Sequence, residues 1–128
     1  MNTVVLDASA ILVVLNSELG SEKLTPAILE TAVSSAVNLA EVQTKLVDHG
    51  MDAAEAWEAA LSSVNKAVDF TVAHAEITGN LFSQTRALGL SLGDRACLAL
   101  GISLGAPIYT ADKSWKNLKL PVRVHVIR

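Results

Sequence analysis

Four acidic residues occupy positions in the chain at which carboxylates could act together. They are Asp7, Glu41, Asp94 and Asp112. Asp7 directly follows a run typical of a short strand, and Asp112 comes shortly after another. Asp94 lies in the first turn of a predicted helix, and Glu41 lies early in another. Ligand sites in open parallel sheets form outside the carboxyl ends of the strands. We therefore expect all four side chains to converge on one edge of a sheet.

Asp7 has the surroundings that least resemble those of an ordinary surface acid. It lies inside the apolar segment Val4–Leu12, where an ionised carboxylate is costly unless it is paired or coordinated. No basic residue is near it in the sequence. Several carboxylates brought together would also raise one another's pKa values unless a cation lay between them. This pattern predicts a bound divalent metal ion.

The expected metal is Mg²⁺, with Mn²⁺ as the other candidate, because the donors are oxygen atoms and the three histidines are too scattered for a zinc site. Asp7 and Asp94 are the expected direct ligands, and Asp112 is a direct or water-mediated ligand. Glu41 is either a ligand or the group that orients an attacking water. For Asp94, an ordinary helix cap is an alternative interpretation.

Short runs rich in β-branched residues alternate with helical patterns along the chain. The predicted strands are Thr3–Leu6, Val33–Ser35, Val68–Thr71, Ile108–Thr110 and Val122–Ile127. This alternation predicts right-handed βαβ units and an α/β fold with a mainly parallel central sheet covered on both faces.

Capping signals place the helices between these strands. A helix containing Leu39 and Leu46 can end at Gly50, and Asp52 then opens a second helix of a hairpin. A third pattern runs from about Ala73 to Leu88. Ser91 can cap a last, largely apolar helix from Leu92 to Leu104.

The bulk properties favour a single domain over residues 1–128. Hydrophobic residues make up 51% of the chain and the mean hydropathy is +0.40, which is high enough to suggest a protein partner. No apolar stretch reaches the roughly 18 residues that cross a bilayer, so we expect no membrane insertion or export. The single cysteine, Cys97, lies in an apolar run and suits a buried thiol in a reducing cytoplasm.

The net charge of −3 does not by itself favour nucleic acid, but the charges are unevenly distributed. All 13 acids lie at or before Asp112, and five of the 10 basic residues follow it. Lys113, Lys116 and Lys119 could contact phosphates next to the last acid, with an ordinary solvated edge as an equal alternative. Trp115 lies among these lysines and could stack on a base, although packing against the body is the stronger interpretation.

Four segments, in their order and spacing, carry a resemblance that extends over nearly the whole chain. They are Val4–Ala10, Ser35–Val42, Leu90–Leu100 and Ile108–Asp112. Together they resemble PIN-domain ribonucleases and, more specifically, the VapC toxins of bacterial toxin–antitoxin modules. The resemblance implies a three-layer α/β/α sandwich with a parallel sheet, a homodimer, and cleavage of transfer or ribosomal RNA with Mg²⁺ or Mn²⁺. It also implies inhibition by a VapB-type antitoxin.

The family's functional residues match positions in this sequence. Its acidic site corresponds to the four acids named above, and its neighbouring hydroxyl positions correspond to Ser9 and Thr110. Arg86 and Arg95 match positions that the family keeps basic, although a helix-surface ion pair explains each of them equally well. The resemblance therefore implies an intact nuclease site.

Two other classes of protein are weaker alternatives. A receiver-like signalling module needs adjacent acids early in the chain and a phosphorylatable Asp at the end of a middle strand, whereas Asp69 lies inside its predicted strand. A catalytically silent binding protein would use the apolar surface for assembly alone. The sequence contains no P-loop, dinucleotide fingerprint or nucleophile elbow, which argues against other common enzyme classes.

Overall fold

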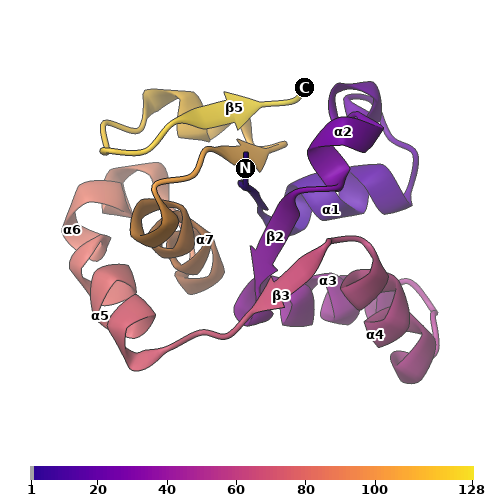
Figure 1. Ribbon diagram of the computed structural model, residues 1–128. Coiled ribbons are helices and arrows are strands. Elements are labelled where there is room, and N and C mark those ends of the chain that lie inside the picture. The colour runs from indigo at the N-terminus through magenta and orange to yellow at the C-terminus, as the bar shows by residue number, and fades with distance from the viewer. Residues whose placement is uncertain (1) are drawn as a thin grey trace.

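A five-stranded parallel sheet forms the middle layer of the molecule (Figure 1). The structure is a computed structural model that describes residues 2–128. Its strands lie in the order β3-β2-β1-β4-β5, and each neighbouring pair is parallel. Their bounds are β1 Val4–Leu6, β2 Ala32–Ser35, β3 Lys66–Val68, β4 Ile108–Thr110 and β5 Val124–Val126. The predicted α/β class with a parallel central sheet is confirmed.

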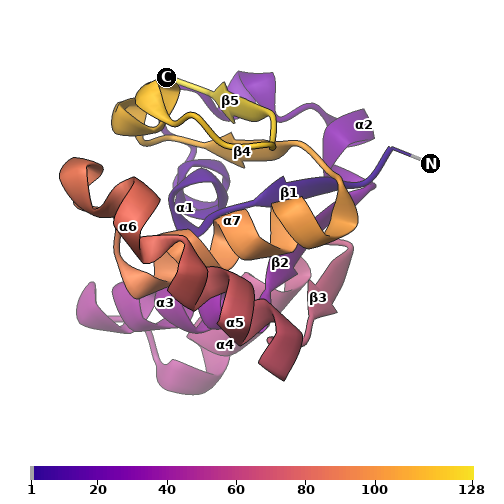
Figure 2. The same ribbon diagram turned by 90° about the vertical axis from the view of Figure 1, so that its left-hand side faces the viewer.

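Helices cover both faces of the sheet, which makes the fold a three-layer sandwich (Figures 1 and 2). One face carries α1 (Ala8–Leu15), α3 (Ala36–Asp48) and α4 (Ala53–Ser62), with α2 (Pro26–Leu29) at its margin. The other face carries α5 (Val72–Asn80), α6 (Phe82–Thr85) and α7 (Leu92–Leu104). Short 3₁₀ helices connect these elements: η1 (Ser21–Lys23), η2 (Arg86–Leu88) and η3 (Lys113–Asn117).

Two hydrophobic cores hold the layers together, one on each side of the sheet. Val4 and Leu6 of β1 point into the core shared with α1, α3 and α4, while Val5 points into the core shared with α7. This is the alternation of side chains that a strand imposes. Because β1 is buried on both faces, its continuous apolar sequence fits the central strand of a parallel sheet. The residue that follows it is therefore held by packing on both sides.

The strand order brings two of the four acids next to each other. β1 pairs directly with β4, with Leu6 opposite Tyr109, so the residues after these strands lie at the same edge of the sheet. Asp7 follows β1, and Asp112 lies two residues beyond β4. The predicted juxtaposition of these chain segments is thus a direct result of sheet topology.

The third strand differs from the prediction. It covers Lys66–Val68 instead of starting at Val68, so Asp69 follows the strand and does not lie inside it. The start of the strand was missed because Lys66 is charged and exposed, and so does not fit an apolar strand pattern. β3 is nevertheless an edge strand, separated from β1 by β2. Asp69 is therefore not placed at the end of a middle strand, as a receiver-like module would require.

The helix predicted from about Ala73 to Leu88 is divided into three shorter pieces, α5, α6 and η2. The hydroxyls of Thr78 and Thr85 donate to carbonyl oxygens four residues earlier, at 2.7 and 2.9 Å. Such bonds compete with the helical ladder and favour bends. Within residues 2–128, none of the helices is both long enough and apolar enough for a membrane span.

Candidate active site

Asp7 is the most constrained of the four acids. It is only 3% exposed and is the N-cap of α1, where its Oδ1 accepts a hydrogen bond of 2.8 Å from the backbone N–H of Ala10. Ser9 Oγ donates to both carboxylate oxygens, at 2.8 and 2.9 Å, and Thr110 Oγ1 donates to Oδ2 at 2.7 Å. The carboxylate is therefore fixed in one orientation by three neighbours.

Burial raises the pKa of Asp7 from 3.8 to about 6. Desolvation is the largest cause, and the negative charge of Asp94 adds to it. The hydrogen bonds from Thr110, Ala10 and Ser9 act in the opposite direction but do not compensate fully. The only salt bridge among residues 2–128 joins Glu18 to Arg128, so no cationic side chain neutralises Asp7 there. A metal ion would supply the missing positive charge.

The two hydroxyls beside Asp7 also organise the segment that leads to Asp112. Ser9 Oγ accepts a hydrogen bond from the backbone N–H of Ala111 at 2.9 Å, and Thr110 Oγ1 accepts one from that of Asp112 at 3.0 Å. These bonds fasten the end of β4 to the start of α1. Ser9 and Thr110 thus link the segments that carry the two aspartates.

Asp112 itself is exposed and caps η3. Its Oδ1 accepts hydrogen bonds from the backbone N–H and the hydroxyl of Ser114, at 2.9 and 2.8 Å. One carboxylate oxygen is therefore occupied by local contacts. This arrangement fits a water-mediated role better than a direct one.

Asp94 lies in the first turn of α7 and is half-buried. Its Oδ2 accepts a hydrogen bond of 2.9 Å from the backbone N–H of Ser91, while Ser91 Oγ accepts one from the backbone N–H of Asp94. Asp94 therefore does take part in capping the start of α7, which was the alternative interpretation of this residue. Asp94 is also close enough to raise the pKa values of Asp7 and Glu41 by its charge, so it belongs to the same cluster.

Glu41 reaches the cluster from α3 with the help of two residues that the sequence analysis did not identify. The side-chain amide of Asn38 donates hydrogen bonds to Glu41 Oε1, at 2.7 Å, and to the carbonyl oxygen of Gly93, at 3.0 Å. Any Cβ at position 93 would collide with the Glu41 carboxylate. The Asn-x-x-Glu spacing and a glycine beside Asp94 were the available signals.

The environment of Glu41 also changes its acidity. Desolvation raises the pKa of this carboxyl, and the charge of Asp94 adds a smaller contribution, against the hydrogen bond from Asn38. Cys97 lies beneath this cluster, fully buried, and burial together with the charges of Asp7, Asp94 and Glu41 raises the pKa of its thiol. All three acids are thus near enough to Cys97 for their charges to act on its thiol.

The donor chemistry of this cluster fits a hydrated Mg²⁺ or Mn²⁺ ion. Within residues 2–128, no three His, Cys, Asp or Glu side chains approach closely enough to enclose a metal together. An all-protein cage is therefore not formed. Mg²⁺ typically keeps several waters and needs only one or two carboxylates, which Asp7 and Asp94 can provide.

The basic segment beyond Asp112 divides into exposed and buried parts. Lys113, Lys116 and Lys119 are exposed. Trp115 is 1% exposed and packs in the core beside α7, so its indole is not available to stack on a base in this structure. Of the two alternatives for Trp115, packing is the one observed.

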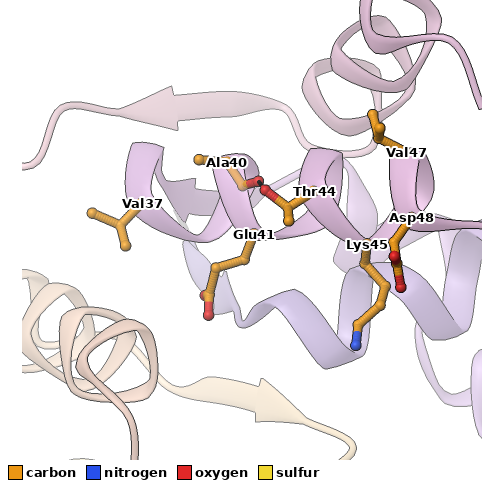
Figure 3. Close-up of a pocket in the computed structure, with 7 residues that line it drawn as sticks. All are labelled: Val37, Ala40, Glu41, Thr44, Lys45, Val47 and Asp48. Atoms are coloured by element: carbon orange, nitrogen blue, oxygen red, sulfur yellow. Dashed lines mark hydrogen bonds between the residues drawn. The ribbon is translucent and has the colours of Figure 1, made fainter.

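A groove of about 710 Å³ runs along the outer side of α3 and reaches Glu41 (Figure 3). Its lining residues are Val37, Ala40, Glu41, Thr44, Lys45, Val47 and Asp48. Glu41 and Lys45 project to the same side of the helix. The groove therefore connects the acidic cluster with a partly apolar surface.

Several solved structures share this fold. The protein shares 19% identity and a TM-score of 0.75 with Mycobacterium tuberculosis VapC20, described as a Sarcin-Ricin loop cleaving toxin, over 94% of this chain and 99% of that one. It shares 18% identity and a TM-score of 0.74 with VapBC2 from Rickettsia felis bound to a promoter DNA fragment. This match covers 98% of this chain and 99% of that one. DNA-bound VapBC from Salmonella typhimurium gives 16% identity and a TM-score of 0.73, with both chains covered completely.

Comparison of sequences identifies the family. A search of curated proteins returned no match. The family model for the PIN domain matches residues 4–120, which include all four acids. The resemblance noted from the sequence is thereby confirmed, and this protein belongs to the PIN domain family.

Proposed function

We propose that this protein is a metal-dependent endoribonuclease and the toxin of a VapBC-type toxin–antitoxin module. The observation that carries the proposal is the buried Asp7 carboxylate, which has hydroxyl and amide donors around it, two further acids nearby and no cationic partner. Membership of the PIN domain family and the likeness to VapC20 support nuclease chemistry.

In the proposed mechanism, Asp7 and Asp94 hold Mg²⁺ or Mn²⁺, with Asp112 acting through water. When bound, the ion would lower the pKa of a coordinated water and offset the negative charge that develops on the phosphate. Ser9 and Thr110 keep the Asp7 oxygens oriented by their hydrogen bonds. Their proposed role is geometric, because both hydroxyls direct their hydrogen bonds at the Asp7 carboxylate and so fix its orientation.

Glu41 is the proposed proton acceptor for the attacking water. Asn38 holds Oε1, which leaves Oε2 as the oxygen that would take the proton. The raised pKa of Glu41 makes its carboxylate a stronger base than an exposed one. The water oxygen would bond to phosphorus and give its proton to Glu41, while the P–O bond to the departing strand breaks. The departing oxygen would leave with a negative charge and take a proton from solvent water.

The proposed substrate is transfer or ribosomal RNA. The description of VapC20 as a toxin that cleaves the Sarcin-Ricin loop makes ribosomal RNA a reasonable first choice. An acidic cluster repels RNA, so cations must surround it. We assign this role to the exposed Lys113, Lys116 and Lys119, which follow Asp112 directly in the chain.

The proposed partners are a VapB-type antitoxin and a second copy of the chain. Several similar structures are VapBC complexes, which supports the antitoxin. The helical hairpin α3–α4 exposes Val47, Met51 and Leu61, at 41%, 37% and 39%. Val47 lines the groove on α3, Met51 lies between the two helices and Leu61 lies on α4. A protein partner would cover these apolar side chains.

The test is cleavage of total cellular RNA by purified protein with Mg²⁺, Mn²⁺ or EDTA, beside the Asp94→Asn variant. Asparagine can still accept the hydrogen bond from Ser91, so the variant keeps the cap while it loses the charge. Discrete fragments that need the metal and Asp94 would support the proposal. Asp52→Asn, at an exposed helix cap distant from the cluster, is the matched control. Absence of cleavage by folded, antitoxin-free protein would favour a silent binding protein.

A further inference from the structure

Two arginines gather around one phenylalanine ring and have no part in the mechanism above. The Arg86 guanidinium lies 5.7 Å from the centroid of the Phe82 ring, and the Arg95 guanidinium lies 5.2 Å from it. Phe82 is 50% exposed, so its ring is reachable from solvent. We call these three residues the Arg–Phe–Arg cluster.

The cluster shares helix α7 with the proposed site. Arg95 immediately follows Asp94 in α7, and Phe82 begins α6. Figure 2 shows α6 on the side of the molecule toward which the arrowheads of β4 and β5 point, which is the carboxyl edge of the sheet. The coil of η3, between β4 and β5, lies on the same side. Elements that carry these cations, α6 and η3, therefore lie at the carboxyl edge of the sheet, which is also where Asp7 follows β1.

The arginines are not used for ion pairs within the part of the chain that the structure describes. Among residues 2–128, the only salt bridge joins Arg128 to Glu18, so the ion-pair alternative for Arg86 and Arg95 is not observed there. Arg95 donates one hydrogen bond, from Nη1 to the carbonyl oxygen of Thr78 at 3.0 Å. Its Nε is buried without a partner in the described chain. The exposed Arg86 makes no side-chain hydrogen bond within residues 2–128, so its guanidinium donors are free for a ligand, whereas Arg95 can offer only its remaining Nη donors.

Stacking on a ring suits these arginines to bind phosphate. A guanidinium that lies over an aromatic face keeps the N–H donors at its edge free, and those donors match phosphate oxygens in pairs. The ring also restricts the long side chains before binding, which lowers the entropy lost on association. A protein partner would need carboxylates at the same spacing, whereas every RNA strand carries phosphates at regular intervals.

We infer that the Arg–Phe–Arg cluster is a phosphate clamp that binds a single-stranded segment of RNA beside the scissile bond. This inference rests on the proposed nuclease function. Arg86 and Arg95 would each contact a backbone phosphate, and Phe82 would hold both guanidinium groups in position. The clamp determines where the strand runs and takes no part in bond cleavage.

Binding of a short fluorescent single-stranded RNA, measured in EDTA over a range of salt concentrations, tests the clamp without cleavage. Arg86→Gln and Arg95→Gln should each reduce the salt slope by about 0.7, the value for one phosphate contact on a single strand. Phe82→Leu keeps both charges, so it should leave the slope unchanged and weaken binding roughly threefold to tenfold. Phe82→Tyr, which retains the ring, should restore wild-type affinity.

Kinetics with Mg²⁺ provide the second readout. Because the clamp contacts substrate and transition state alike, each arginine variant should raise KM about tenfold, the size of one charge-assisted hydrogen bond, with kcat unchanged. Arg128→Gln removes an equal charge that is paired with Glu18, and it is the matched control. Thermal melting of every variant separates loss of binding from loss of folding.

The outcomes distinguish the clamp from the proposed function. If the wild type cleaves RNA but the arginine variants keep its salt slope and KM, the clamp is wrong and the nuclease assignment stands. A reduced slope in a protein that cleaves no RNA would support the clamp and refute the nuclease. If folded wild-type protein neither binds nor cleaves RNA, both are overturned.

Discussion

Two helices of this protein begin with the same local structure in very different surroundings. Asp7 caps α1 with φ −82° and ψ 173°, and Asp52 caps α4 with φ −61° and ψ 141°. Both backbones are extended, and both side chains accept hydrogen bonds from backbone N–H groups of the first turn. By local criteria the two residues are equivalent N-caps.

The rest of the fold makes them different. Asp52 is exposed and its carboxylate contacts only its own helix start. Asp7 is buried, receives hydrogen bonds from Ser9 and from Thr110 on another strand, and has a pKa of about 6. A capping aspartate therefore becomes a candidate metal ligand when tertiary packing removes water and leaves its charge without a cation.

The largest expected effect is on RNA cleavage. Asp7→Asn should reduce the rate by about 10³-fold or more, because losing one electrostatic group from an active site commonly costs 10²–10³. Asp52→Asn should leave the rate unchanged. Single-turnover assays with Mg²⁺ measure both. Equal rates in wild type and Asp7→Asn would refute the distinction between the two caps.

The two substitutions should also differ in their effect on the free energy of unfolding, and here the loss of the Asp7 charge is favourable. A carboxyl whose pKa is raised from 3.8 to about 6 by folding destabilises the native state once it ionises. That penalty is absent below pH 3.8, grows as the pH rises to about 6, and is constant above it. Asp7→Asn should therefore stabilise the metal-free protein at pH 7 by up to about 3 kcal/mol. Asp52→Asn should show no such gain.

Urea unfolding in EDTA at pH 4 and pH 7 measures this penalty. Added Mg²⁺ should recover stability in the wild type at pH 7, by about 2.7 kcal/mol at a hundredfold excess over Kd, and should do so far less in Asp7→Asn. A wild-type stability that does not depend on Mg²⁺ would argue against an ion at Asp7.

A smaller effect is expected from the residues that position Glu41. Gly93→Ala places a methyl group against the Glu41 carboxylate and should reduce cleavage about 100-fold, near the upper range for residues that orient a reactive group. Gly79→Ala, in α5 with open space around its Cβ position, is the control and should gain about 0.8 kcal/mol of helix stability. Comparable activity in both alanine variants would show that Glu41 needs no such space.

The smallest loss of cleavage should come from substitution of Asp112. This residue is exposed like Asp52, but like Asp7 it lies at the carboxyl edge of the sheet. Its carboxylate is held by Ser114, so Asp112→Asn should reduce cleavage only about tenfold, as for an outer-shell contact. Metal titration should show a weaker apparent affinity with the maximal rate largely retained. A loss as large as that of Asp7→Asn would indicate direct coordination instead.

Much of the fold could be predicted because the relevant signals are local. β-branched runs marked β1 and β4, and Ser91 with Asp94 formed the predicted start of α7. The exposed strand β3 was misplaced because its burial pattern is weak. The break between α5 and α6 was missed because it depends on threonine hydroxyls that bond back to the helix.

The identity of the acids, the apolar strand before Asp7 and the PIN-like order of the site residues can be recognised from the chain alone. The burial of Asp7, the support of Glu41 by Asn38 and Gly93, and the position of Phe82 against two arginines become visible in the folded molecule. Desolvation and side-chain contacts depend on residues far apart in the chain. Periodicity and capping describe only near neighbours.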